Sequence, residues 1–522
     1  MKFQMDDFIW SLFIMISLLV LVAYLMSWFR QNRLQHYSLP IRESNKGHRF
    51  YMVDMFNSRT YCNIEEIALT HGAQCDTCGV CVGDKNMNEA NKKIPCKAAS
   101  TDETIVRHHW VRGNLPAFSL CMVCKQECGV EMALVDLQCA WCRNTAHDNC
   151  AEKTDICDLG QFKKFIIPPN CIQVKWVGVK GNKHLVVENV KRPPIEDWSP
   201  LIVIANRKSG SNDGLLILRH FRQYLNPAQV IDIQDIQPEQ ALEWCRLLPT
   251  CRLLVCGGDG TIGWVLNVIE KLSIMNPPRV CILPLGTGND LSQVLGWGEG
   301  YSGNVNVRCI LENVEKAKPV ELDRWTVRIL HKKHFGISRP SKTYTMNNYL
   351  SVGVDALVTL KFHKKRESWP AFFTHRLINK FCYFTYGTKD VLERECKDLH
   401  KRIQLELDDK EISLPELEGI VVLNISCWGG GCRPWGQAEE FQKPRYDDGM
   451  LEVMGLFSSF HIAQLQIGLA TPLRLGQAKK VKITLLDKNA PMQVDGEPWE
   501  QHPASITVTY KQQAAMLALT DQ

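Results

Sequence analysis

The sequence predicts a multidomain fold with an N-terminal transmembrane helix, two small zinc-binding modules, an α/β nucleotide-binding lobe and a mostly antiparallel β lobe. Three observations support this prediction. Residues 8–29 carry no charge, twelve of the 22 cysteines fall between Cys62 and Cys157, and two glycine-rich loops follow short apolar runs beyond residue 250. At 522 residues the chain is also long enough for several domains.

The uncharged segment 8–29 is long enough, as a helix, to cross about 30 Å of hydrocarbon. A cleaved signal peptide is the alternative, but its apolar core would span roughly 7–15 residues after a basic start, whereas Asp6 and Asp7 precede this segment. Basic residues gather on its C-terminal side, which places the rest of the chain in the cytosol. We therefore expect a single-pass protein of the endoplasmic reticulum or plasma membrane, with a monotopic hairpin as the alternative topology.

Residues 108–157 have the spacing of a double zinc site. The pattern is His-x12-Cys-x2-Cys-x14-Cys-x2-Cys-x4-His-x2-Cys-x6-Cys, and eight such ligands can close two tetrahedral Zn²⁺ sites. The histidines at metal-ligand spacing favour zinc over disulfides. The pattern resembles the phorbol-ester/diacylglycerol-type zinc module, in which the two sites interleave. The ligand sets that this resemblance implies are His108, Cys139, Cys142 and Cys157 for one metal, and Cys121, Cys124, His147 and Cys150 for the other.

Residues 48–96 repeat this pattern in a degenerate form. One ligand set that the resemblance implies is intact: His48, Cys75, Cys78 and Cys96. In the other set Cys62 is retained, but Glu65 and Asn86 stand where cysteines are expected. We therefore expect three structural Zn²⁺ ions in the chain rather than four. The sequence leaves open whether either module binds diacylglycerol or is only structural.

Residues 158–199 are predicted to form a linker, because two Pro-Pro pairs interrupt any long element. Residues 200–319 then alternate strand and helix patterns, which implies a parallel sheet with ligands at the carboxyl ends of its strands. The two glycine loops, Gly-Gly-Asp-Gly-Thr and Gly-Thr-Gly-Asn-Asp, follow the second and third predicted strands. The candidate nucleotide-binding residues at this edge are Asn206, Lys208, Ser209, Gly257, Gly258, Asp259, Gly260, Thr261, Gly286, Thr287, Gly288, Asn289 and Asp290.

Glycine in these loops lets the backbone approach a phosphate closely, and the free N–H groups of the following helix can hold it. One such loop would suit a structural turn equally well. Two loops that both follow strands instead predict a nucleotide phosphate site. Neither loop matches the Walker A or the GxGxxG pattern.

This pair of loops resembles the catalytic domain shared by diacylglycerol kinases, sphingosine kinases and NAD kinases. Further segments narrow the resemblance to the diacylglycerol kinase family: ILPLGTGNDLSQVLGWG at 282–298, LDRW at 322–325, NISCWGGGCRPWG at 424–436, DDGMLEV at 447–453 and MQVDGEPW at 492–499. The resemblance implies a membrane lipid kinase that uses ATP and Mg²⁺ to convert 1,2-diacyl-sn-glycerol into phosphatidic acid and ADP. It further implies a preference for arachidonoyl diacylglycerol and a link to phosphatidylinositol turnover, with acyl recognition in residues 374–387.

Phosphoryl transfer to an alcohol needs a carboxylate that accepts the hydroxyl proton. The resemblance implies that Asp495 is this base and that Glu497 holds it or a metal-bound water. Asp259 is the alternative base, by analogy with NAD kinases. Asp259, Asp290 and Asp323 match family positions that form an acidic, Mg²⁺-linked network.

Residues 320–512 read mostly as strands, which predicts an antiparallel second lobe with the active site between the lobes. The formal net charge of +5 is too small to indicate a nucleic-acid partner. Diacylglycerol and phosphatidic acid in the bilayer are the expected partners, and the sequence does not indicate an oligomeric state. Two alternatives stay open: the same chemistry on a sphingoid base or ceramide, and a catalytically dead, diacylglycerol-responsive adaptor.

Overall fold

The computed structural model describes residues 14–22, 25–26, 47–177, 184–301, 303, 306–331, 340–368, 396–436 and 438–519. The chain divides into two compact units. The first comprises Met1–Pro200 and Arg219–Val230, and the second comprises Leu201–Leu218 and Ile231–Gln522.

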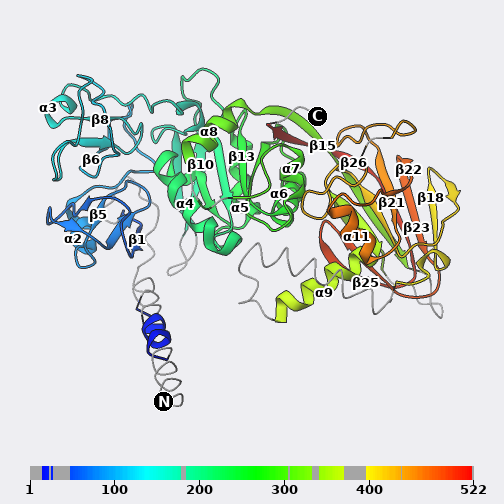
Figure 1. Cartoon of the computed structure of the whole chain (residues 1–522). Coiled ribbons are helices and arrows are strands. Elements are labelled where there is room, and N and C mark those ends of the chain that lie inside the picture. Colours follow the sequence, from blue (N-terminus) through cyan, green and yellow to red (C-terminus); the bar gives the residue numbers. More distant parts are fainter. Residues whose placement is uncertain are drawn as a thin grey trace, which may run out of the picture. The chain divides into compact units, whose positions relative to one another are not determined.

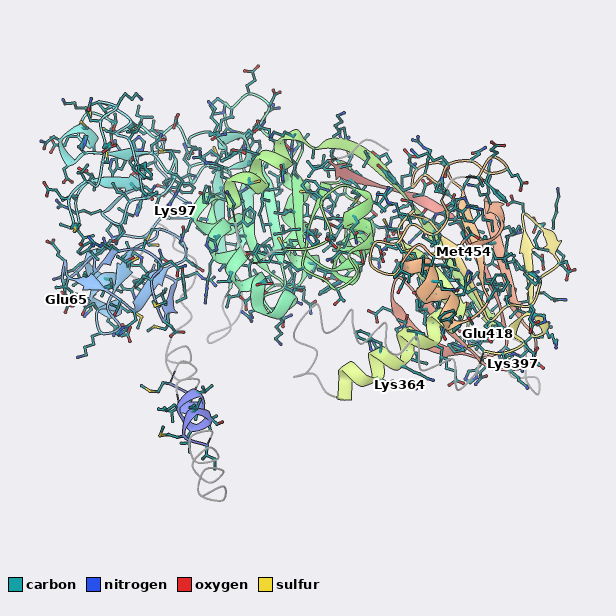
Figure 2. The ribbon with its side chains drawn as sticks, in the orientation of Figure 1. Glu65, Lys97, Lys364, Lys397, Glu418 and Met454 are labelled. Atoms are coloured by element: carbon teal, nitrogen blue, oxygen red, sulfur yellow. The ribbon has the colours of Figure 1, made fainter. Side chains whose placement is uncertain are left out.

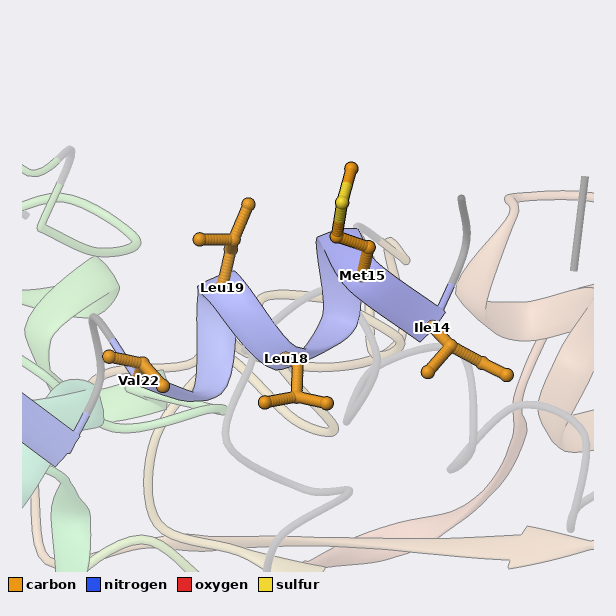
Figure 3. Close-up of a pocket in the computed structure, with 5 residues that line it drawn as sticks. All are labelled: Ile14, Met15, Leu18, Leu19 and Val22. Atoms are coloured by element: carbon orange, nitrogen blue, oxygen red, sulfur yellow. The ribbon is translucent and has the colours of Figure 1, made fainter. Parts of the chain in front are cut away.

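Residues 14–22 form a helix with exposed apolar side chains. Figure 3 shows Ile14, Met15, Leu18, Leu19 and Val22 pointing outward from it. The rest of the predicted transmembrane segment 8–29, apart from residues 25–26, lies outside the described residues. In the part of the chain that the structure describes, no helix combines the length and apolarity needed to cross a membrane.

The two cysteine-rich modules of the first unit are small β-structures. The elements of the first module are β1 (Phe50–Val53), β2 (Thr60–Tyr61), β3 (Ala68–Leu69), β4 (Gly72–Cys75), β5 (Cys81–Val82) and α2 (Met87–Lys93). Those of the second module are β6 (Trp110–Arg112), β7 (Leu137–Cys139), β8 (Thr145–Ala146) and α3 (Asp148–Ala151). The core of each module consists largely of cysteines and alanines. Modules with so little apolar volume usually need a metal to fold.

The predicted linker contains a 3-10 turn (Lys163–Phe165) and an antiparallel hairpin of β9 (Ile172–Val177) and β10 (His184–Val190). A parallel sheet follows, as the sequence predicts. Its strands β11 (Leu201–Ala205), β13 (Arg252–Gly257) and β14 (Arg279–Pro284) pair in that order, with β12 (Val230–Asp232) beside β11. These strands are almost wholly buried, as expected for a parallel sheet covered on both faces. The helices of this region are α4 (Asp213–Tyr224), α5 (Pro238–Glu243), α6 (Asp259–Leu272), α7 (Asp290–Val294) and α8 (Val307–Lys316).

The strand-rich remainder of the second unit is mostly antiparallel, as the sequence predicts. Among the described residues, one six-stranded sheet has the order β22 (Leu473–Ala478), β21 (Leu451–Leu456), β20 (Gly419–Leu423), β17 (Tyr349–Gly353), β24 (Ala490–Val494), β25 (Glu497–Gln501). The other strands are β15 (Lys318–His331), β16 (Lys342–Met346), β18 (Ile403–Leu407), β19 (Lys410–Ile412), β23 (Lys480–Leu485) and β26 (Ala504–Ala518). The main apolar core contains residues from both sets of strands. Helices α9 (Val354–Ser368) and α11 (Ser459–Gln466) contribute to a second apolar cluster.

The long strands β15 and β26 form a ribbon that connects the two predicted lobes (Figure 1). Strand β26 pairs in parallel with β14 at Met516 and antiparallel with β23 farther along. The pairing of β15 with β26 shifts register between Arg324 and Trp325, which leaves Lys511 as an extra residue on β26. The two predicted lobes therefore share one sheet.

Candidate functional site

The two glycine loops lie against each other at the carboxyl ends of β13 and β14. A Cβ atom added to Gly286 would lie 2.6 Å from the Cα of Gly258, and one added to Gly258 would lie 3.0 Å from the Cα of Gly286. The contact at Gly286 is closer than real Cβ atoms come, so this position requires glycine, and the contact at Gly258 is tighter than nearly all real Cβ contacts. The two loops therefore form one backbone surface at the sheet edge.

Two carboxylates converge beside these loops. Asp259 begins helix α6, and its Oδ2 and Oδ1 accept hydrogen bonds from the N–H groups of Asp290 (3.1 Å) and Leu291 (3.3 Å). Oδ2 of Asp290 and Oδ2 of Asp259 lie 3.6 and 3.7 Å from the place that a Cβ on Gly288 would occupy. Burial and the neighbouring Asp259 raise the pKa of Asp290 to about 7. A divalent cation would relieve this repulsion, and carboxylate oxygens are the ligands that Mg²⁺ prefers.

Asp290 is held by residues that the sequence does not predict for the site. Its Oδ1 accepts hydrogen bonds from the N–H groups of Gly430 (2.9 Å) and Gly431 (2.7 Å), and its Oδ2 accepts one from the Tyr349 hydroxyl (3.3 Å). Both glycines have positive φ angles, 93° and 107°, that other residues rarely adopt. Three consecutive glycines in NISCWGGGCRPWG are the local signal for such a turn.

Asp495 uses both carboxylate oxygens to hold the turn between β16 and β17. Its Oδ2 accepts from the backbone N–H (2.8 Å) and the Nδ2 (3.0 Å) of Asn347. Its Oδ1 accepts from the N–H groups of Asn348 (2.8 Å) and Tyr349 (3.1 Å). Burial raises the pKa of Asp495 to about 6, against the opposite effect of these donors.

Glu497 has different surroundings, although only Gly496 separates it from Asp495. Its side chain is exposed, and its Oε1 lies 3.9 Å from the place that a Cβ on Gly260 would occupy. Glu497 therefore faces the first glycine loop, near the start of α6.

The other candidates at the sheet edge occupy local turns. Oδ1 of Asn206 accepts a hydrogen bond from the backbone N–H of Lys208 (3.0 Å), and the carbonyl oxygen of Asn206 accepts one from the backbone N–H of Ser209 (2.9 Å). The side chain of Lys208 is exposed in this turn, directly after β11.

The candidates in the two glycine loops also have local contacts. The side chain of Thr261 lies against Gly257, where an added Cβ atom would be 2.7 Å from the Cβ of Thr261. Thr287, in the second loop, is half-buried. Asn289 adopts a positive φ of 54° and donates to the Gly286 carbonyl (2.9 Å).

Asp323 has contacts of a different kind. Its Oδ2 accepts from the N–H of Gly449 (2.7 Å), and its Oδ1 accepts from Nε2 of Gln513 (2.9 Å). These bonds connect it to the DDGMLEV segment and to β26. Burial raises the pKa of Asp323.

The predicted zinc ligands form three four-residue groups, and within each group the candidate ligand atoms lie within 4.8 Å of one another. Tetrahedral coordination with Zn–S bonds of ~2.3 Å places ligand atoms ~3.8 Å apart. The sulfur pairs Cys75–Cys96 and Cys139–Cys157 are separated by 3.8 and 3.9 Å. The residues therefore fit Zn²⁺. The three groups are His48, Cys75, Cys78, Cys96; His108, Cys139, Cys142, Cys157; and Cys121, Cys124, His147, Cys150.

The degenerate position of the first module contains a hydrogen-bonded thiol. Cys62 is fully buried, and its Sγ accepts from the backbone N–H of Glu65 (3.4 Å) and from Nδ2 of Asn86 (3.6 Å). The side chain of Glu65, labelled in Figure 2, is exposed. Asn86 thus contacts the sulfur directly at the position where the module pattern has a cysteine.

Three family models match this chain. The diacylglycerol kinase catalytic domain matches residues 200–322, the diacylglycerol kinase accessory domain matches 345–498, and the phorbol esters/diacylglycerol binding domain (C1 domain) matches 108–159. The chain belongs to the diacylglycerol kinase family. The two kinase-domain matches contain both glycine loops and the hairpin of Asp495 and Glu497, so the residues that meet in this site come from both domains of the diacylglycerol kinase fold.

Relatives named as diacylglycerol kinases align with this chain over different fractions of their own length. Probable diacylglycerol kinase 3 of Caenorhabditis elegans is 36% identical over 516 residues, which covers 90% of this chain and 64% of the relative. Human diacylglycerol kinase theta is 42% identical over 333 residues, which covers 62% of this chain and 35% of the relative. A diacylglycerol kinase structure from Bacillus anthracis shares 16% identity, covers 61% of this chain and 96% of that one, and has a TM-score of 0.38. The chain spans less than two thirds of the length of either curated relative.

Proposed function

We propose that this chain is an ATP-dependent kinase that phosphorylates 1,2-diacyl-sn-glycerol to phosphatidic acid. The observation that carries the proposal is the convergence of four features of the second unit: the paired glycine loops, the carboxylates of Asp259 and Asp290, and the exposed carboxylate of Glu497. Phosphoryl transfer relies on positioning and on neutralising phosphate charge, and these features supply both.

In this proposal the glycine loops bind the phosphates of ATP through backbone N–H groups. Asp259 and Asp290 would hold Mg²⁺, which when bound neutralises phosphate charge. Gly430, Gly431 and Tyr349 fix the orientation of Asp290. Lys208 extends from the same sheet edge and supplies a further positive charge.

We assign the role of general base to Glu497 in place of Asp495. A base needs a free acceptor oxygen that can reach the hydroxyl group. Asp495 accepts four hydrogen bonds from residues 347–349, so both of its oxygens are engaged. Glu497 is exposed and faces the first loop. Asp495 then acts by positioning the hairpin, and Asp259, the alternative base, is engaged at the N-terminus of α7.

The proposal extends to the setting of the enzyme. The exposed apolar helix at 14–22 and the uncharged segment around it support a membrane anchor with the kinase in the cytosol. An apolar segment beside two zinc modules also resembles diacylglycerol kinase epsilon, and with that resemblance come the preference for arachidonoyl diacylglycerol and the link to phosphatidylinositol turnover. The acyl-recognition segment at 374–387 lies outside the described residues.

Product identification tests the proposal. The detergent-solubilised full chain is incubated with γ-labelled ATP, Mg²⁺ and mixed micelles containing a diacylglycerol, a sphingoid base and a ceramide. Labelled phosphatidic acid is the expected product, and Gly286→Ala should abolish it because the new methyl group would collide with the backbone of Gly258. Labelled sphingoid phosphate or ceramide phosphate would identify another acceptor. Diacylglycerol binding without any labelled product would favour the adaptor alternative.

A further inference from the structure

Arg324 is a buried arginine at the centre of a network that reaches both halves of the site. It lies on β15, and only 1% of its surface is exposed. Its Nη1 donates to Glu270 of α6 (2.7 Å), its Nη2 donates to Asn267 of the same helix, and its Nε donates to Oδ1 of Asn347 (2.9 Å). A buried guanidinium is tolerated only when its donors are satisfied, and here they are shared between a helix and a turn.

Asn347 connects this arginine with the hairpin that carries Glu497. While its Oδ1 accepts from Arg324, its N–H and Nδ2 both donate to Oδ2 of Asp495. The turn also packs against α6, because a Cβ added to Gly263 would lie 3.2 Å from the Nδ2 of Asn347. Hydrogen bonds and packing thereby connect the helix that begins with Asp259 to the β24–β25 hairpin, in which Asp495 lies in the turn and Glu497 begins β25.

The network lies at the irregularity of the β15–β26 ribbon. Lys511, the extra residue on β26, pairs with Glu270 through Nζ and Oε1 (2.6 Å) and donates to Oγ1 of Thr345 (2.9 Å). A bulge bends and twists a ribbon locally, so neighbouring contacts must fix its geometry. Beside Arg324 there is a cavity of about 280 Å³ between the C-terminal half of α6, residues 273–280 and residues 512–515. Side-chain packing is therefore incomplete here, and hydrogen bonds and ion pairs provide the fixed contacts.

We propose that Arg324 is a positioning residue for phosphoryl transfer, which sets the placement of Glu497 relative to Asp259 through Glu270 on one side and Asn347 on the other. This inference rests on the proposed kinase function. Arg324 touches neither nucleotide loop, so its loss should leave ATP binding intact and misplace the base. A displacement of about 1 Å at a reacting group can cost about 100-fold in rate.

The decisive variant is Arg324→Ala in the detergent-solubilised full chain. We expect kcat to fall about 100-fold with KM for ATP within about twofold of the starting value. Removing the side chain enlarges the adjoining cavity, so added methylguanidinium ions can take the place of the guanidinium. We expect millimolar methylguanidinium to restore part of the lost kcat, whereas methylammonium at the same concentration should not, because it cannot bridge α6 and Asn347.

Arg328→Ala is the matched control, since Arg328 lies on the same strand and is exposed. It should keep its kcat and show no response to methylguanidinium. If Arg324→Ala unfolds, Arg324→Lys is the second test of the inference. Lysine keeps the positive charge but lacks the planar guanidinium group, so kcat should fall at least about tenfold with unchanged KM for ATP. An unchanged kcat in folded Arg324→Ala or folded Arg324→Lys would overturn the inference. A loss of kcat in folded Arg324→Ala that methylguanidinium does not partly reverse would also overturn it. A parent chain that makes no phosphatidic acid would instead contradict the proposed function.

Discussion

At the scale of single residues, hydrogen-bond saturation distinguishes two neighbouring carboxylates. Asp495 and Glu497 are both acidic residues at one tight turn, and the sequence resemblance favours Asp495 as the base. The four donors of residues 347–349 occupy Asp495, whereas Glu497 is exposed beside Gly260. A carboxylate with saturated oxygens organises structure, and an exposed one can accept a proton.

We expect Glu497→Gln to lower kcat by about 10²–10⁴-fold with little change in KM for ATP, because a proton acceptor acts mainly in the transition state. Steady-state kinetics at saturating diacylglycerol measure both constants. Glu500→Gln, on the same strand and also exposed, is the control and should keep its activity.

Asp495→Asn should instead lower thermal stability together with kcat. An amide has one acceptor oxygen where the carboxylate has two, so some of the N–H donors of residues 347–349 would lose their hydrogen-bond acceptor. A strong loss of kcat in Asp495→Asn at unchanged stability, with a mild effect of Glu497→Gln, would return the role of base to Asp495.

A second residue-scale prediction concerns Glu452, which is fully buried on β21. One of its oxygens accepts from Gln477 (3.0 Å), and burial raises its pKa to about 8. An unfolded glutamate has a pKa near ~4.3, so the folded chain retains a proton that the unfolded chain releases between these values. The contribution of Glu452 to the free energy of unfolding should therefore fall as pH rises from about 4.5 to 8 and change little above that.

Glu452→Gln removes this titration. We expect the variant and the parent to have similar unfolding free energies near pH 5, and the variant to be more stable by about 2–4 kcal/mol at pH 8.5. Urea unfolding of the full chain at three pH values measures the difference. Glu411→Gln, at an exposed position on β19, should show no pH-dependent gain. A difference that does not grow with pH would contradict the assignment.

At the scale of elements, helix α4 belongs to both compact units, since the unit boundary falls between Leu218 and Arg219. Within the first unit, Nζ of the fully buried Lys97, labelled in Figure 2, donates to the carbonyls of Gln223 (3.2 Å) and Leu225 (2.9 Å) at the C-terminal end of α4. The same ammonium lies 4.4 Å from the ring centroid of Trp141 in the second module. One side chain thereby contacts the end of α4 and a zinc module.

Lys97→Met keeps the length of this side chain but removes the charge. We expect the first unit to lose about 2–4 kcal/mol of unfolding free energy, because buried carbonyls at the helix end lose their donor. Thermal unfolding with intrinsic tryptophan fluorescence is the measurement. Lys93→Met, at an exposed position of α2, should change little. Equal effects of the two substitutions would show that the buried contacts contribute nothing.

The two cysteine-rich modules should together bind three Zn²⁺ ions. Metal analysis of the purified full chain should return three Zn²⁺ per chain, since three complete ligand sets are present among the described residues and Cys62 is hydrogen-bonded to Asn86 instead. Under mild chelation the first module should unfold before the second, because it holds one metal and the second holds two. Four equivalents that resist the same chelator would show that the degenerate position still binds metal.

At the scale of the whole molecule, membrane residence is the property that the N-terminal segment should control. Deleting residues 1–30 should release part of the protein from membranes, while activity on detergent-presented diacylglycerol stays largely intact because the site lies in the second unit. Fractionation of both forms, with activity measured in mixed micelles, is the test. An intact chain found entirely in the soluble fraction would contradict the prediction of an anchor.

The local sequence determined the elements and the chemistry of the site. Apolar runs followed by glycines predicted β13, β14 and their loops, and the spacing of cysteine and histidine predicted the three ligand groups. Each of these signals spans a few dozen residues, within which side-chain periodicity and backbone freedom already restrict the structure.

Tertiary structure alone decided how these parts act on one another. Asp290 meets Gly430 from 140 residues away, and Asp495 meets Asn347 from 148 residues away. Such pairs depend on which strands join and in which register, and a bulge at Lys511 changes that register. A carboxylate looks the same in the sequence whether it is exposed or saturated with hydrogen bonds. The donors that make the difference come from strands that only the folded sheets bring together.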